Sequence, residues 1–163
     1  CFGSTSRMDV IELPIVWRAA VAAKDFSVGE EILRESPLML LPKIRKDTPV
    51  FDKLDEIARR NQISEPVLYP VVYWSKSSDE VKSKVMEFFV APVPEGSVQH
   101  KRYFSACAEI HAMEEFSHIP AKEIMDFLLI LRVNAHMVGD GTKTSALFYM
   151  GSKVTHSCEP NCM

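Results

Sequence analysis

The sequence has 163 residues, which suits one domain, and its 47% hydrophobic and 25% charged residues are typical of a globular protein. A net charge of −3 does not favour direct binding to DNA or RNA. The sequence contains no apolar run of about 18 residues, so we expect no membrane-spanning helix.

The first quarter of the chain is predicted to form strands. Short apolar runs occupy residues 15–17, 19–23 and 38–41, and a turn signal and a proline lie between the second run and the third. Gly29 lies in a turn signal, where its freedom to adopt a positive φ is useful. We expect Leu38 and Leu40 to be buried in the last of these strands.

The middle of the chain is predicted to be helical. Residues 51–62 place Phe51, Leu54, Ile57 and Ala58 on one helical face. Residues 65–76 are ambiguous, because their apolar runs suit strands while Pro66 suits the first turn of a helix.

Three further helices are expected before the chain returns to strands. The first starts at Ser78 and runs to about residue 90, the second spans 97–117 and the third spans 121–133. Their predicted inward side chains include the pairs Phe88–Phe89 and Tyr103–Phe104 and the leucines Leu128 and Leu131. A short strand at 146–150 follows, so the order of elements predicts an α+β fold with a segregated helical block.

The C-terminal segment carries the most specific pattern. Residues 152–162 read Ser-Lys-Val-Thr-His-Ser-Cys-Glu-Pro-Asn-Cys. This segment resembles the SET-domain motif Asn-His-Ser-Cys-x-Pro-Asn-Cys, and only the first fixed position differs, where Thr155 replaces Asn. Residues 21–38 resemble the first strands of the SET–MYND-like branch, and residues 132–136 resemble the helix end that leads into its motif.

The resemblance implies a SET-type β core of small sheets with a pseudoknot, spanning residues 9–163 and incomplete at its C-terminus. A helical insertion over 43–133 would interrupt that core, without a MYND zinc finger because the insertion holds only Cys107. The implied activity is protein-lysine methyltransfer from S-adenosylmethionine to a histone or another protein, in the nucleus, the cytoplasm or both.

The resemblance also implies a set of cofactor-binding residues. His156 and Thr155 occupy the motif positions that hold the adenine side and the amino-acid end of the cofactor, and Ser152 and Lys153 line the same approach. Asn134 is expected to reach the methionine part. Residues Trp17, Arg18 and Ala19 stand where the family has Gly-x-Gly, which allows close approach of the backbone to the ligand.

Other implied groups are expected beyond Met163. The family's catalytic tyrosine follows the motif, so this chain alone is expected to be inactive. Cys158 corresponds to the first ligand of a family zinc site whose other cysteines would lie downstream, and a buried structural thiol is the alternative.

Two other functions remain open. Trp17, Ala19 and Thr155 depart from the family pattern, which favours a catalytically inactive SET module that binds proteins as a scaffold. An all-helical adaptor with chance motif matches is disfavoured by the strand-like first segment.

Overall fold

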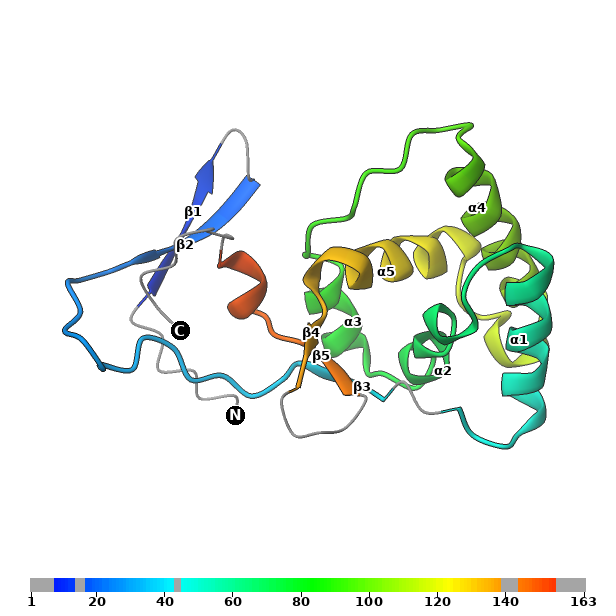
Figure 1. Cartoon of the computed structure of the whole chain (residues 1–163), viewed down its shortest axis with the longest axis horizontal. Helices are drawn as coiled ribbons and strands as arrows, with labels where there is room; N and C mark the ends of the chain where they lie inside the picture. Colours follow the sequence, from blue (N-terminus) through cyan, green and yellow to red (C-terminus); the bar gives the residue numbers. More distant parts are fainter. Residues whose placement is uncertain (1–7, 14–16, 43–44, 139–143, 155–163) are drawn as a thin grey trace.

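The computed structural model describes residues 8–13, 17–42, 45–138 and 144–154. Among these residues the chain forms two small antiparallel sheets and a block of helices, which is an α+β arrangement (Figure 1). All five described α-helices lie in the sequence between the third and fourth strands. The predicted α+β class is therefore confirmed, while the SET-type core and its division into a domain of 9–163 with an insertion of 43–133 stay predictions.

The first sheet is a hairpin of β1 (Met8–Leu13) and β2 (Trp17–Ala22), paired from Met8 opposite Ala22 to Leu13 opposite Trp17. Figure 1 shows this hairpin apart from the helical block, with a long extended segment leading from β2 to the second sheet. Within that segment Gly29 adopts a φ of +83°, as the turn signal predicted.

The second sheet has the strand order β3–β5–β4 and brings the two ends of the helical block together. Its strands are β3 (Met39–Pro42), β4 (His136–Met137) and β5 (Thr144–Leu147). On β3, Met39 and Leu41 are buried, whereas Leu40 is 53% exposed. The prediction that Leu40 is buried is wrong because successive side chains alternate between the two faces, and only one face of this edge strand meets the core.

Five helices and two short 3₁₀ turns supply most of the core. Their bounds are α1 (Pro49–Arg60), η1 (Glu65–Val67), α2 (Pro70–Trp74), α3 (Asp79–Val85), α4 (Val98–His111), η2 (Glu114–Phe116) and α5 (Ala121–Asn134). The four residues predicted to share the inner face of α1, Phe51, Leu54, Ile57 and Ala58, are all buried.

The ambiguous stretch 65–76 is helical. Pro66 and Pro70 each stand in the first turn of their helices, where a missing N–H costs nothing. The indole of Trp74 then stacks on Phe127 with ring centroids 4.3 Å apart, and its Nε1–H donates to Glu123 at 3.1 Å. Packing against α5 thus decides a conformation that local sequence left open.

Two helix predictions need correction. The helix expected over 97–117 ends at His111, and η2 turns the chain so that Phe116 is buried and α5 can pack against α4. The helix expected to reach residue 90 ends at Val85, which leaves Phe89 48% exposed beyond it. Phe104 is 61% exposed and stacks on His100. The predictions that Phe89 and Phe104 belong to the core are therefore wrong.

The helix α5 forms the centre of the core. Its side chains Ile124, Phe127 and Ile130 are fully buried, and Leu128 is 2% exposed, while Leu131 is only partly buried. No helix among the described residues is long and apolar enough to cross a membrane.

Candidate functional site

The residues predicted to bind a cofactor are only partly described. Thr155, His156 and Cys158 lie outside the described residues, and so does the side chain of Trp17 at the start of β2. Arg18, Ala19, Asn134, Ser152 and Lys153 are described, and the geometry below concerns them.

The turn that carries Ser152 and Lys153 follows β5 directly. It is a 3₁₀ helix, η3 (Gly151–Lys153), which Figure 1 shows in red-orange beside β2. A Cβ at Gly151 would lie 2.9 Å from the Cβ of Phe148, so the tight approach of this turn to its own strand requires glycine. The Ser152 hydroxyl donates to the carbonyl of Tyr149 at 2.9 Å and closes the turn.

A distant carboxylate holds this turn in place. The Glu35 carboxylate accepts the backbone N–H of Met150 at 2.9 and 3.0 Å and that of Gly151 at 3.0 Å. The segment between β2 and β3 is therefore tied to the start of η3 by charge-assisted hydrogen bonds.

Lys153 is a buried cation in this turn. The residue is 5% exposed, and its Nζ donates to the Tyr149 carbonyl at 2.5 Å. The same nitrogen lies 3.5 Å from the ring centroid of Tyr149 and 5.3 Å from that of Phe88. Burial and the nearby charge of Arg18 lower the pKa of Lys153, against the opposing charges of Glu87 and Glu35.

Glu87 links the β1–β2 hairpin to the turn. Its Oε2 accepts the Tyr149 hydroxyl at 2.6 Å and lies 3.6 Å from a guanidinium nitrogen of Arg18. The hydrogen bond to Glu87, together with partial burial, raises the pKa of Tyr149. Two cations, one shared carboxylate and two aromatic rings thus lie within one cluster, which we term the Tyr149 cluster: Arg18, Glu87, Phe88, Tyr149 and Lys153.

Asn134 lies at the end of α5 and borders this cluster through the backbone. Its Nδ2 donates to the carbonyls of Phe89 and Ile130, each at 2.8 Å. The residue is 5% exposed, and both amide protons are used within the fold. Only the oxygen of this side chain is left for a ligand, which is a narrower role than the sequence predicted.

Ala19 is 3% exposed in β2, so its methyl group is packed where the family pattern has a glycine. The hairpin accommodates that methyl group within its packing. The role predicted for Ala19 in approaching the cofactor stays a prediction.

Sequence reasoning missed the groups that organise this site. Glu35, Glu87, Phe88 and Tyr149 are separated by up to 116 residues from the atoms that they contact. No local pattern marks them. An acidic residue shortly before a proline, like Glu35, and an aromatic residue shortly after a strand, like Tyr149, are common in proteins of every function. The pairing of β3 with β5 brings the segments of Glu35 and Tyr149 together, and Glu87 and Phe88 reach them from the segment that follows α3.

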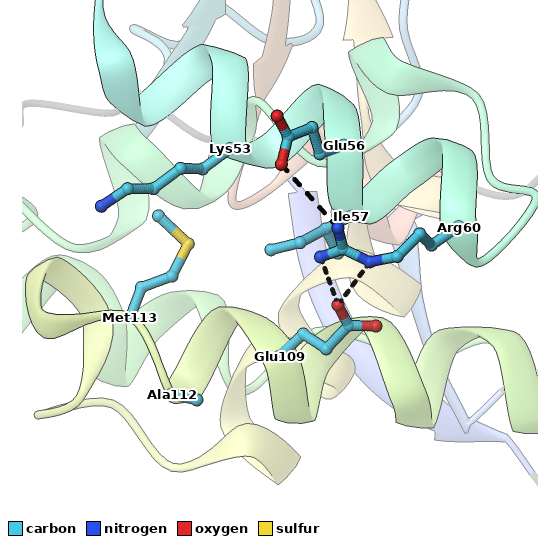
Figure 2. A pocket seen from close by; sticks show the side chains of 7 residues that line it. All are labelled: Lys53, Glu56, Ile57, Arg60, Glu109, Ala112 and Met113. Atoms are coloured by element: carbon cyan, nitrogen blue, oxygen red, sulfur yellow. Dashed lines mark hydrogen bonds and ion pairs between the residues drawn. The ribbon is translucent and has the colours of Figure 1, made fainter.

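The described residues also form a shallow pocket of about 320 Å³ between α1 and α4 (Figure 2). Its charged walls neutralise one another: Arg60 lies 2.6 Å from Glu109 and 3.8 Å from Glu56, and Lys53 lies 3.3 Å from Glu115 beside it. The carboxylates of Glu109 and Glu115 are thus engaged in ion pairs with α1.

No cluster of three or more metal-ligating side chains occurs in the described part of the chain. The thiol of Cys107 is buried in the helical core, and burial raises its pKa to about 12, so it is a packing residue. The zinc ligand predicted at Cys158 lies outside the described residues and stays a prediction.

Comparison of the chain with protein-family models, with curated proteins and with solved structures gave no match. The resemblance to SET domains therefore rests on the residues of this chain alone.

Proposed function

We propose that the chain forms most of a SET-type core and that the protein transfers a methyl group from S-adenosylmethionine to a lysine of a histone or another protein. The observation that carries the proposal is the motif of residues 155–162, which keeps every fixed position but one. The α+β order of strands, helices and strands supports it, as does the position of η3 immediately before the motif.

The side chains of the Tyr149 cluster fit the chemistry of this cofactor. S-Adenosylmethionine carries a carboxylate, an ammonium group and a sulfonium. Lys153 and Arg18 provide positive charge for the carboxylate. The rings of Tyr149 and Phe88 face the Lys153 ammonium and help to hold it in place.

When bound, the cofactor would supply the methyl group for an in-line transfer to a neutral lysine amine. The chain's own residues contribute by orienting and desolvating the reactants. Glu35 fixes the turn from which Ser152 and Lys153 project, and Glu87 fixes Tyr149 against Arg18. A protein substrate is the expected partner, and direct binding of nucleic acid is not part of the proposal.

The activity is tested with the full-length protein, because the resemblance puts the tyrosine after Met163. We expect radiolabelled methyl transfer to core histones or to a lysine peptide array, with loss of transfer in His156→Ala. Lys122→Met is a matched control, since Lys122 is an 83% exposed lysine of α5. Absence of transfer to every protein substrate by a folded protein would remove the enzyme proposal.

A catalytically inactive scaffold is the second candidate, and two observations favour it. Ala19 is packed at 3% exposure where glycine would admit the cofactor, and Asn134 has used both amide protons. The scaffold predicts that the folded protein captures a histone-tail peptide with or without S-adenosylmethionine. The enzyme predicts that the cofactor strengthens capture of the lysine peptide.

A further inference from the structure

Lys153 has fewer polar partners than a buried ammonium group requires. A lysine ammonium has three N–H donors, and at 5% exposure it has little access to water. One donor reaches the Tyr149 carbonyl at 2.5 Å, and the remaining contacts are the faces of Tyr149 and Phe88. Two donors are therefore left without a protein oxygen among the described residues.

The carboxylates near Lys153 are committed elsewhere. Glu35 accepts the N–H groups of Met150 and Gly151, and Glu87 accepts the Tyr149 hydroxyl and pairs with Arg18. None of the described carboxylates forms an ion pair with the Lys153 ammonium. The charges of Glu87 and Glu35 therefore act on Lys153 only from a distance, and an anionic group of a ligand in direct contact would lower the cost of burying this ammonium.

The charge of Arg18 points to the same class of ligand. Arg18 lies 3.6 Å from the Glu87 oxygen that accepts the Tyr149 hydroxyl, and Lys153 contacts the carbonyl and the ring of the same tyrosine, so two cations share this part of the cluster. A carboxylate with two oxygens can accept from both cations, whereas a neutral group would leave their repulsion in place.

We propose that Lys153, with Arg18, forms a carboxylate-binding subsite that holds the amino-acid end of the cofactor. This inference rests on the proposed function, because it takes S-adenosylmethionine as the ligand. Thr155 lacks the amide that grips this end of the cofactor in the family pattern, and Lys153 stands two residues before it. An ion pair from the preceding turn thus replaces part of the contact that the family makes with a neutral amide.

Comparing the affinities of two nucleosides isolates the contribution of the carboxylate contact to binding. S-Adenosylhomocysteine carries the amino-acid end, and 5′-methylthioadenosine is the same thioether without it. Titration calorimetry on the full-length protein should give a preference for S-adenosylhomocysteine of about tenfold or more, as expected for a charged hydrogen bond. Lys153→Met should lose most of this preference without changing the affinity for 5′-methylthioadenosine, and Lys122→Met should keep it.

An unchanged preference in Lys153→Met would overturn the inference. Tighter binding of both nucleosides by that variant would also overturn it, because Lys153 would then be an internal cation that blocks the aromatic faces. Lys153→Arg retains the charge and should retain part of the preference. In the unmodified protein, the NMR signal of the Lys153 ammonium should shift with S-adenosylhomocysteine and stay unchanged with 5′-methylthioadenosine, which tests the contact without any substitution.

The outcomes for the subsite and for the enzyme can be told apart. A Lys153-dependent preference in a protein that transfers no methyl group supports the subsite and contradicts the enzyme. Methyl transfer with a preference that does not depend on Lys153 contradicts the subsite alone. Failure of both nucleosides to bind contradicts both.

Discussion

Replacing Glu35 by alanine should loosen the turn that carries Ser152 and Lys153. The Glu35 carboxylate makes three contacts of 2.9–3.0 Å with the N–H groups of Met150 and Gly151. Hydrogen bonds to a charged group contribute about 1.5–3 kcal/mol each, and the lower end applies because Glu35 is only half-buried. Because two N–H groups lose their acceptor, we expect Glu35→Ala to lower the free energy of unfolding by about 3 kcal/mol.

Hydrogen exchange localises the effect better than global stability does. In Glu35→Ala the amides of Met150 and Gly151 should exchange about tenfold to a hundredfold faster, since each 1.4 kcal/mol is a factor of about ten. Glu35→Gln keeps one acceptor oxygen and should give an intermediate effect. Glu56→Ala removes an exposed carboxylate of α1 and should leave these amides unchanged.

Equal exchange rates at Met150 and Gly151 in Glu35→Ala and in the unmodified protein would refute this reasoning. That result would mean that the turn is held by its own short contacts, such as the bond from the Ser152 hydroxyl to the Tyr149 carbonyl.

Three further predictions concern stability. Leu128 is 2% exposed in α5, so Leu128→Ala should lower the free energy of unfolding, measured with a denaturant, by about 2–5 kcal/mol. Leu40 is 53% exposed, so Leu40→Ala should lower it by less than about 0.5 kcal/mol. Equal losses for the two variants would show that the core is misassigned. Asn134→Ala should cost about 1–3 kcal/mol because it leaves the carbonyls of Phe89 and Ile130 without their side-chain donor, and an unchanged melting temperature would contradict this. Burial and the hydrogen bond to Asp55 raise the pKa of Tyr69 from 10.0 to about 12, so its contribution to stability is complete below pH 10 and is lost as the pH rises toward 12. Tyr69→Phe should remove that part of the pH dependence, and identical unfolding curves for both proteins between pH 9 and 12 would count against it.

The parts of the fold that follow from local pattern were predictable. The inner face of α1 and the extent of α5 follow from a 3.6-residue period, and the N-caps of α3 and α4 follow from Ser78 and Ser97. The exposed side of β3 was not predictable, because the apolar run 38–41 does not show which face meets the core. Leu40 therefore appeared equivalent to its neighbours Met39 and Leu41 until the sheet was seen.

The candidate site was predictable only where its residues fall in a recognised sequence pattern. Arg18, Ser152 and Lys153 were identified in this way, and the structure adds that Lys153 is buried. The other members of the cluster are far away in the sequence: Glu87 and Phe88 follow α3, and Arg18 lies in β2. No local pattern spans these separations. Long-range pairing, and with it the electrostatics of the cluster, depends on the whole fold.

The central claim is that this chain contributes the binding site of S-adenosylmethionine. Calorimetric titration of the cofactor into the full-length protein and into Thr155→Asn tests it most directly. The account predicts saturable binding weaker than micromolar in the unmodified protein, and binding about tenfold to a hundredfold tighter in Thr155→Asn, because the amide restores one or two hydrogen bonds to a charged ligand end. Absence of saturable binding in both folded proteins would contradict the account.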